Sequence, residues 1–211
     1  MTGRVLTVFG NKGGTGKSMT AVHLAVSLMD RGRRVIAVDL DARQGDTKAF
    51  FEARGQEQVV AIPNEVEELL ELFENAKAQD VDVVVDCPPA DSPMAMAAAE
   101  HSDGTIYPFL SGANDARSLG RAIRIATQTQ QPGALFCLVN KYKNTNDARA
   151  LVAMLGSVGV FTMAGVVGDR NAFNSALRAG RTVWEMNEDA KAVLEMRAIC
   201  DNIHRVMERK R

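Results

Sequence analysis

The sequence predicts an α/β fold, an open and mostly parallel twisted sheet that is flanked by helices on both faces. Six apolar runs typical of strands alternate with segments whose apolar residues recur at helical spacing. The strand runs are continuously apolar, as expected for parallel strands that are buried on both faces. No linker, repeat or low-complexity stretch interrupts the 211 residues, so a single domain over residues 1–211 is expected.

The expected elements follow one another closely along the chain. Strands are expected at residues 5–9, 34–40, 81–86, 105–109, 134–140 and 163–167. Helices are expected at residues 18–29, around 50–51, from 64, at 94–100, 115–130, around 148–155, at 171–179 and from 188 to the end. Asn64 and Glu67 have the spacing of a capping box at the third of these helices.

A glycine-rich loop separates the first strand from the first helix. Residues 10–18 read Gly-Asn-Lys-Gly-Gly-Thr-Gly-Lys-Ser. Strand, glycine loop and helix together are the context of a phosphate-binding loop, because glycines let backbone N–H groups turn towards an anion at the positive end of the helix dipole. In such a loop Lys17 reaches the terminal phosphates and the Ser18 hydroxyl holds Mg²⁺.

The loop also carries a second lysine, Lys12, and has Asn11 where the common pattern G-x-x-x-x-G-K-[ST] has glycine. Two lysines in one small loop repel each other unless an anion lies between them. The pattern K-G-G-x-G-K-S resembles the deviant phosphate loop of the ParA/MinD ATPases. The resemblance implies ATP and Mg²⁺ as cofactors, and it implies that Lys12 crosses a dimer interface to the partner's phosphates. The expected nucleotide contacts in the loop are Lys12, Gly13, Gly14, Thr15, Gly16, Lys17, Ser18 and Met19.

Three aspartates follow expected strands, at the edge where such sheets bind ligands. Asp86 closes an apolar strand as a Walker B aspartate does, so it is a candidate for holding Mg²⁺. The ParA/MinD family has an aspartate-x-aspartate element where Asp39 and Asp41 stand. By that resemblance Asp41 orients the attacking water and Asp39 supports the Mg²⁺ shell, although Asp41 as a turn cap stays open. The family continues with proline and glutamine, whereas this chain has Ala42, Arg43 and Gln44.

The resemblance extends over nearly the whole chain, through residues 86–89, 97–103, 168–170 and 176–180. Asn140, after the fifth expected strand, matches a family position near the adenine base. An amide can hydrogen-bond a purine edge, but asparagine also ends strands for turn reasons.

Charge is distributed unevenly along the chain. Residues 1–105 carry 10 Lys and Arg against 17 Asp and Glu, a net charge of −7, and residues 106–211 carry 15 against 9, a net charge of +6. This asymmetry indicates a face for an anionic partner, although the acidic helix near residue 70 contributes to it. The family resemblance places DNA near a helix end in the basic half. The candidate DNA contacts are Arg178, Arg181, Arg205 and Arg209, whereas Arg117, Arg121 and Arg124 are expected near the dimer interface.

The function implied by the resemblance is that of a ParA-type partition ATPase without the N-terminal DNA-reading extension of longer members. Such a protein forms an ATP-dependent homodimer, binds DNA without sequence preference, and is stimulated by a ParB-like partner. One alternative is a MinD-like membrane-bound regulator, which requires an amphipathic membrane helix; the last apolar stripe here is needed to cover the sheet. A ligase or an iron–sulfur reductase on the same scaffold is the other alternative.

The remaining reactive side chains indicate structural roles. Cys87, Cys137 and Cys200 are too widely spaced for a Cys-x-x-Cys metal or redox motif. Cys87 and Cys137 lie in apolar strand-like runs, so buried reduced thiols are expected there rather than a cluster site. The three histidines are scattered without metal-ligand spacing. No apolar run reaches 18 residues and no signal peptide is recognisable. We therefore expect a cytoplasmic protein without stable membrane insertion, associated with the nucleoid when it holds ATP.

Overall fold

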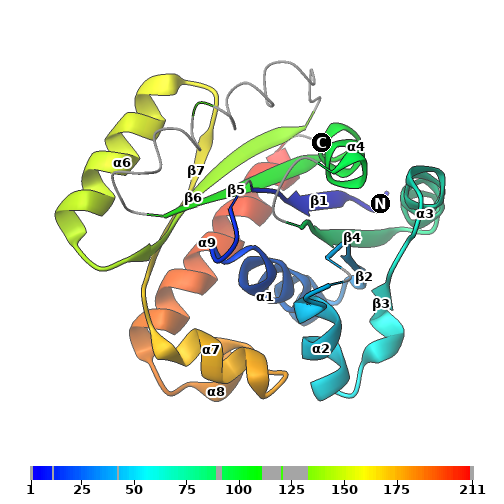
Figure 1. The fold of residues 1–211 in the computed structure, drawn as a ribbon, viewed down its shortest axis with the longest axis horizontal. Coiled ribbons are helices and arrows are strands. Elements are labelled where there is room, and N and C mark those ends of the chain that lie inside the picture. The colour runs from blue at the N-terminus through cyan, green and yellow to red at the C-terminus, as the bar shows by residue number, and fades with distance from the viewer. Residues whose placement is uncertain are drawn as a thin grey trace.

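The fold was analysed in a computed structural model that describes residues 2–10, 12–41, 43–88, 92–110, 120 and 133–209. Strands and helices alternate along the chain (Figure 1). The strands are β1 Val5–Val8, β2 Arg34–Asp39, β3 Val60–Ala61, β4 Val81–Asp86, β5 Gly104–Leu110, β6 Ala134–Tyr142 and β7 Thr162–Gly168. The helices are α1 Lys17–Asp30, α2 Asp46–Ala53, the 3₁₀ turn η1 Glu57–Val59, α3 Val66–Ala78, α4 Pro93–Glu100, α6 Thr145–Val158, α7 Asn171–Arg178, α8 Val183–Met186 and α9 Ala190–Arg209.

The described strands form one sheet in the order β3-β2-β4-β1-β5-β6-β7, and every neighbouring pair among them is parallel. All of these strands therefore end at the same edge. The register places Asp39 of β2 beside Asp86 of β4, and Asp86 beside Val8 of β1. The strand ends that precede the glycine loop and the acidic loops are thus next to one another.

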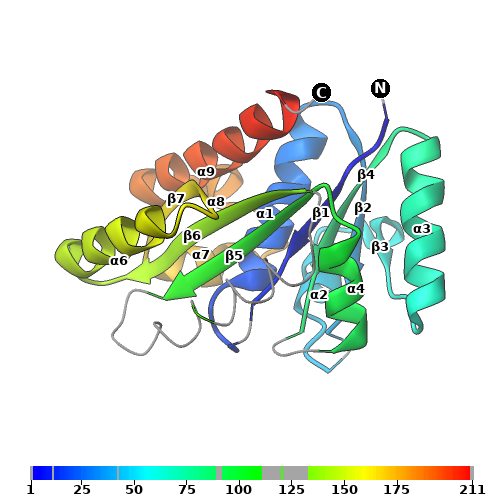
Figure 2. The ribbon, with the colours of Figure 1, turned by 90° about the horizontal axis from the view of Figure 1, so that it is seen from above.

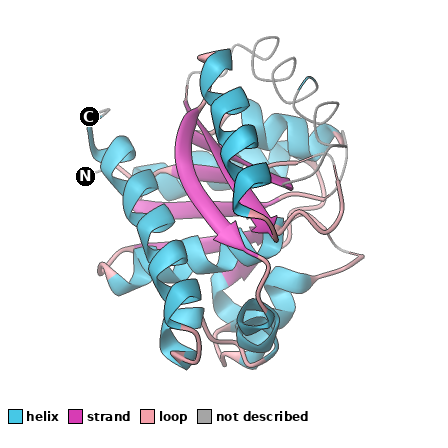
Figure 3. Cartoon of the chain, turned by 90° about the vertical axis from the view of Figure 1, so that its left-hand side faces the viewer, coloured by secondary structure: helices cyan, strands magenta, loops and turns pink. Residues whose placement is uncertain are grey.

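Helices cover both faces of the sheet (Figures 2 and 3). Alternate residues of each strand point to opposite layers, so Leu6 and Val8 pack under α1, α2, α7, α8 and α9, while Val5 and Phe9 pack under α3, α4 and α6. Burial on both faces is the reason that the strands read as unbroken apolar runs. The predicted open parallel sheet with two helical layers is confirmed.

Several details differ from the sequence-based expectation. The two-residue strand β3 was not expected; it is too short to produce a periodic pattern, and it is defined by its pairing with Ala37 and Val38 of β2. The short helix α8 was also missed, and the last helix begins at residue 190 rather than 188. The expected helix at 115–130, with Arg117, Arg121 and Arg124, lies outside the described residues.

The capping box predicted for Asn64 and Glu67 is wrong. Helix α3 begins at Val66, and Glu65 is its N-cap without a side-chain hydrogen bond. The carboxylate that reaches back is that of Glu68, which accepts a hydrogen bond from the backbone N–H of Asn64 at 2.8 Å. The helix starts later than the sequence suggested, so the side chain in the third helical position is Glu68.

Candidate functional site

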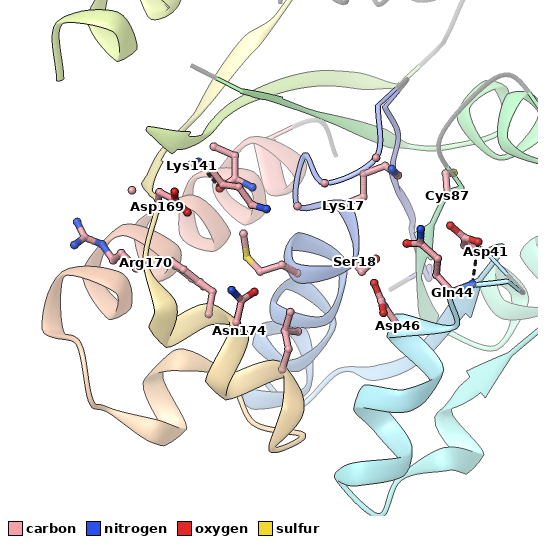
Figure 4. A pocket seen from close by; sticks show the side chains of 18 residues that line it. Lys17, Ser18, Asp41, Gln44, Asp46, Cys87, Lys141, Asp169, Arg170 and Asn174 are labelled. Atoms are coloured by element: carbon pink, nitrogen blue, oxygen red, sulfur yellow. Dashed lines mark hydrogen bonds between the residues drawn. The ribbon is translucent and has the colours of Figure 1, made fainter. Parts of the chain in front are cut away.

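A pocket lies beyond the carboxyl ends of β1, β2, β4, β6 and β7, and it gathers the loops that follow these strands (Figure 4). This is the edge at which open α/β sheets bind ligands. The residues that line it are Gly13, Gly14, Gly16, Lys17, Ser18, Met19, Asp41, Gln44, Asp46, Cys87, Asn140, Lys141, Gly168, Asp169, Arg170, Phe173, Asn174 and Leu177.

The glycine loop forms one wall of this pocket and leads directly into α1. Gly16 is the N-cap of α1 with φ at 89°, a left-handed conformation that favours glycine, and no side chain caps the helix. The first N–H groups of α1 are therefore left for another acceptor. A Cβ at Gly13 or Gly14 would meet no atom within 4 Å, so the backbone there borders open space. Free N–H groups, a helix N-terminus and an open backbone suit a phosphate chain.

Lys17 is the most buried cation of the loop, with only 7% of its surface exposed. Its Nζ donates to the backbone oxygen of Lys12 at 3.2 Å, and the Thr15 hydroxyl donates to the same oxygen at 3.3 Å. Burial lowers the pKa of Lys17, while the charges of Asp86, Cys87 and Asp41 oppose the shift. A bound phosphate would offset the cost of burying the charged lysine, because its negative charge favours the protonated form of Lys17. Lys12, the residue whose carbonyl closes the loop, is itself half-buried.

Asp86 fits the role of a Mg²⁺-supporting carboxylate. It is 1% exposed, and its Oδ2 accepts a hydrogen bond from the Thr47 hydroxyl at 2.9 Å. Its Oδ1 is buried and has no hydrogen-bond partner among the residues that the structure describes. Burial raises its pKa to about 7, although hydrogen bonding to Ser18 and Thr47 and the charge of Lys17 favour the ionised form. An orphaned carboxylate oxygen near the Ser18 hydroxyl is a donor set that suits a hard cation or its water ligands.

Asp39 holds the loop that follows β2. It is 1% exposed, and its two carboxylate oxygens accept hydrogen bonds from the backbone N–H groups of Asp41, at 3.0 Å, and of Lys48, at 2.9 Å. Burial raises its pKa, and these two hydrogen bonds oppose the shift. Both oxygens are therefore engaged in fixing the acidic loop, and support of a Mg²⁺ shell by Asp39 stays a prediction.

Asp41 lines the pocket and also shapes its own loop. Its Oδ1 accepts a hydrogen bond from the Gln44 N–H at 3.3 Å, and its backbone oxygen accepts from Gln44 at 3.1 Å and from Gly45 at 2.8 Å. The turn-cap role that the sequence left open is thus present. Its position at the pocket keeps the water-orienting role available.

Asn140 stands at the carboxyl end of β6, fully buried against the glycine loop. Its Nδ2 donates to the backbone oxygen of Thr15 at 2.7 Å, and its Oδ1 accepts from the Lys141 N–H at 2.9 Å. The structure therefore brings Asn140 to the pocket, and its contact with adenine stays a prediction.

Sequence reasoning missed several pocket residues, and those with polar side chains are Gln44, Asp46, Lys141, Asp169, Arg170 and Asn174. Lys141 adopts φ of 51°, unusual for a lysine, beside a register shift between β6 and β7. Such strand irregularities leave little trace in a sequence. Asp46 and Gln44 had a signal, since they belong to the loop that departs from the family pattern.

The far rim of the pocket is tied to α9 through Glu195. This carboxylate accepts hydrogen bonds from the Arg170 guanidinium at 2.9 and 3.2 Å, from the Gly168 N–H at 3.0 Å and from the Tyr142 hydroxyl at 3.0 Å. Burial would raise the pKa of Glu195, but these partners outweigh it and the pKa is lowered. The ends of β6 and β7 are thereby fixed to one helix.

The candidate DNA contacts all lie on the surface, and the structure places them in two groups. Trp184, which follows Arg178 and Arg181 in the chain, donates a hydrogen bond to Asp30 at 3.0 Å, and Asp201, which precedes Arg205 and Arg209, pairs with Arg31. Each group is therefore a few residues from a contact to the carboxyl end of α1. The groups are Arg178 with Arg181, at the end of α7, and Arg205 with Arg209, in the last turns of α9.

The cysteines and histidines have the structural roles that were expected. All three cysteines are free and buried, and burial raises the pKa of Cys137 and Cys200 to about 12 and that of Cys87 far above its usual range. His23 is buried with a pKa lowered to about 4, whereas His101 is exposed. Within the described ranges, no three His, Cys, Asp or Glu side chains are grouped to hold a metal, and no helix is long and apolar enough to cross a bilayer.

Comparison with known proteins agrees with this geometry. The family model of the CobQ/CobB/MinD/ParA nucleotide-binding domain matches residues 6–183. The chain belongs to this family. It is 24% identical to the protein ParA of Rhizobium radiobacter over 192 residues, which cover 86% of each chain. It is 25% identical to the protein IncC of Escherichia coli over 257 residues, which cover 98% of this chain and 71% of IncC. The fold is similar to that of the MinD cell division protein of Aquifex aeolicus, with a TM-score of 0.76 at 16% identity over 97% of each chain.

Membership of this family defines the chemistry of the pocket. The chain is an ATPase of the ParA/MinD type, and its cofactors are ATP and Mg²⁺. The glycine loop, the uncapped start of α1 and the orphaned oxygen of Asp86 fit these ligands.

Proposed function

We propose that this chain is a ParA-type ATPase of one domain, residues 1–211, that dimerises on binding ATP, binds DNA without sequence preference in that state, and releases it after slow hydrolysis. One observation carries the proposal: the phosphate loop contains Lys12 as well as Lys17, and the Lys12 carbonyl is the acceptor on which Lys17 and Thr15 converge. These two hydrogen bonds hold the backbone of Lys12 at the phosphate site.

The chain's own residues divide the work of hydrolysis. Bound ATP with Mg²⁺ supplies a terminal phosphoryl group for transfer to water. Residues 13–19 would wrap the phosphates, with Lys17 neutralising their charge, and Ser18 and Asp86 would hold the cation, supported by Asp39. Asp41 orients the attacking water, and Lys12 reaches the phosphates held by the partner subunit. Asn140 is the candidate contact for the adenine base, as the family resemblance implies.

Dimerisation is tested by Lys12→Ala. Because Lys17 remains, we expect this variant to bind nucleotide nearly as the parent does but to stay monomeric with ATP and to lose turnover. Lys17→Ala is the contrasting variant and should lose nucleotide binding itself. Light scattering with ATP, paired with calorimetric titration, separates the two, and a Lys12→Ala protein that still dimerises on ATP contradicts the proposal.

DNA binding is proposed for the basic surface at Arg178, Arg181, Arg205 and Arg209. All four side chains are exposed, and backbone phosphates of any sequence can pair with them. Each contact releases counterions, so the affinity should fall with salt at a log–log slope of about −0.9 per contact, and a dimer doubles the contacts.

An electrophoretic gel shift with ATP on DNA of unrelated sequences tests this surface. Arg178→Glu with Arg181→Glu should abolish the shift and leave basal turnover in place, and Arg178→Glu alone should weaken it. Arg149→Glu, the same charge reversal on exposed helix α6 of the other layer, is the matched control and should bind normally. Unchanged retention of the double variant would move the site elsewhere.

The cellular role we propose is partition or positioning of plasmid or chromosomal DNA or another large cargo, with a ParB-like partner that stimulates hydrolysis and with nucleoid association while ATP is bound. The support is the similarity to ParA and IncC together with the basic surface. Turnover in the presence of DNA should rise when the product of a neighbouring gene for a small basic DNA-binding protein is added. The reductase alternative is disfavoured by three buried cysteines on separate elements.

A further inference from the structure

A long-range hydrogen bond joins the end of β6 to the phosphate loop. The Asn140 side chain, 0% exposed, donates from Nδ2 to the backbone oxygen of Thr15 at 2.7 Å, across 125 positions of sequence. The loop residue that accepts this bond lies between the two lysines, and the next residue, Gly16, caps α1. The amide therefore contacts the phosphate loop at the point where it becomes a helix.

The orientation of this amide is fixed from both ends. Its Oδ1 accepts a hydrogen bond from the Lys141 N–H at 2.9 Å, so a flipped amide would set oxygen against the Thr15 carbonyl and NH₂ against an N–H group. Lys141 has φ of 51°, and the ladder between β6 and β7 shifts register between Val139 and Tyr142. The strand thus departs from regular geometry where Asn140 turns to the loop.

The loop is shaped to receive this side chain. A Cβ at Gly16 would lie 2.0 Å from the Asn140 Nδ2, and Gly16 has φ of 89°. Asn140 therefore occupies the space that a side chain at position 16 would need. The amide can reach the Thr15 carbonyl only because residue 16 is glycine.

We propose that Asn140 is a positioning residue for the phosphate loop. In a trans peptide the C=O and the following N–H point in opposite directions, so holding the Thr15 carbonyl on Asn140 fixes the direction of the Gly16 N–H. That N–H stands at the start of α1, among the groups that face an anion. This role rests on the proposed use of residues 13–19 for phosphates, and it differs from the adenine contact that family resemblance implies for Asn140.

The two roles predict different losses when the amide is removed. A positioning role acts on the phosphate chain, so every triphosphate suffers equally, whatever base it carries. An adenine-reading role acts on ATP alone and sets the preference of ATP over GTP. The decisive probe is a ligand without any base, inorganic tripolyphosphate with Mg²⁺.

We would measure the affinities of the parent and Asn140→Ala for Mg-ATP, Mg-GTP and Mg-tripolyphosphate by isothermal titration calorimetry. Losing this bond orphans a buried carbonyl, so all three affinities should fall by a similar factor, on the order of ten- to a hundredfold. An ATP affinity that falls while tripolyphosphate binding is unchanged overturns the inference in favour of adenine reading. A parent that binds no triphosphate overturns the proposed function, and this inference with it.

Two further variants separate positioning from general destabilisation. Asn202→Ala removes a similar bond, from an asparagine Nδ2 to the Ala164 backbone oxygen at 3.0 Å, away from the pocket, and should leave all three affinities unchanged. Asn140→Asp keeps the acceptor for the Lys141 N–H but sets a second oxygen against the Thr15 carbonyl, so it should bind at least as weakly as Asn140→Ala. Parent-like binding of tripolyphosphate by Asn140→Asp would refute the positioning role.

Discussion

The two walls of the nucleotide pocket are built in different ways. On one wall, Asp39 binds backbone N–H groups two and nine residues further along the chain, and Asp86 binds Thr47. On the other wall, Asn140 binds Thr15 and Glu195 collects the ends of β6 and β7, over separations of 25 to 125 residues. On the first wall, which we call the acidic wall, Asp39 fixes its loop through near neighbours in the sequence, although the bond between Asp86 and Thr47 spans 39 residues. The second, the rim wall, is organised by tertiary contacts.

Because the two walls are built differently, we expect substitutions in them to affect different properties of the protein. In the proposed mechanism the strand-end carboxylates of the acidic wall act at the reacting end of the triphosphate, so we expect their loss to affect chemistry more than folding. The rim wall joins α9, β6 and β7, so its loss should affect stability and binding more than chemistry. Four measurements test this division, in order of decreasing expected effect.

The largest effect is expected at Asp41. Asp41→Ala should bind ATP and dimerise but hydrolyse about a hundredfold or more slower, because the attacking water is no longer oriented. Single-turnover assays measure this rate. Asp41→Asn keeps an oxygen for the Gln44 N–H, so a residue needed only for the turn would be fully rescued by asparagine. Normal turnover of either variant would reduce Asp41 to a turn cap.

A smaller effect on the same wall is expected from Thr47. Its hydroxyl donates a hydrogen bond to Asp86 at 2.9 Å, and Thr47→Val removes this bond at nearly constant volume. Partners of metal-supporting groups typically contribute about ten- to a hundredfold in metal affinity. The Mg²⁺ concentration for half-maximal turnover should rise accordingly, with the maximal rate less affected. Thr105→Val, equally buried on β5, is the control, and an equal rise in both would contradict the assignment.

The acidic wall was also the part that could be predicted from sequence. Gly16, Lys17, Ser18, Asp39, Asp41 and Asp86 stand at strand ends or in the loop, so periodicity and spacing placed them at one edge. On the rim wall only Asn140 was expected at the site, and that expectation came from the family resemblance rather than from periodicity or spacing. Lys141 enters the pocket through a strand irregularity, and Glu195 comes from a helix whose apolar stripe explains its other residues. No local pattern encodes a partner that lies 125 residues away.

The third effect concerns the link between α1 and α8. His23 on α1 accepts a hydrogen bond at Nε2 from the Val183 N–H at 3.1 Å, and its Nδ1 lies 2.7 Å from the Met19 oxygen. Burial lowers its pKa from 6.5 to about 4. The unfolded chain therefore takes up the proton first, so the stability is present above pH 6.5 and is lost as the pH falls towards 4.

The lowered pKa of His23 sets the size of the change in the free energy of unfolding between two pH values. At pH 5 His23 should cost the fold about 2 kcal/mol relative to pH 7.5. Urea unfolding of the parent and His23→Gln measures this: the difference between their free energies of unfolding should shrink by about that amount between pH 7.5 and 5. Other groups contribute equally to both proteins and cancel. Replacement of exposed His101 by glutamine is the control; a pH-independent difference for His23→Gln would show that its buried pKa is ordinary.

The smallest effect is expected from Glu195, and it bears directly on the rim wall. Its carboxylate is 18% exposed and pairs with Arg170 while accepting from Tyr142 and Gly168. In Glu195→Gln an NH₂ group must face one of these donors, so we expect a loss of about 1–2 kcal/mol in the free energy of unfolding. The Arg31–Asp201 pair is about half exposed on both sides, so Asp201→Asn should cost less than about 1 kcal/mol. Thermal unfolding with and without Mg-ATP measures both variants.

The stabilisation that Mg-ATP gives to each variant tests whether Glu195 organises the rim for binding. If the rim must be held for the nucleotide to bind, Mg-ATP should stabilise Glu195→Gln less than it stabilises Asp201→Asn. Equal stability and equal gain in the two variants would leave Glu195 as an ordinary surface pair and would remove the contrast between the walls.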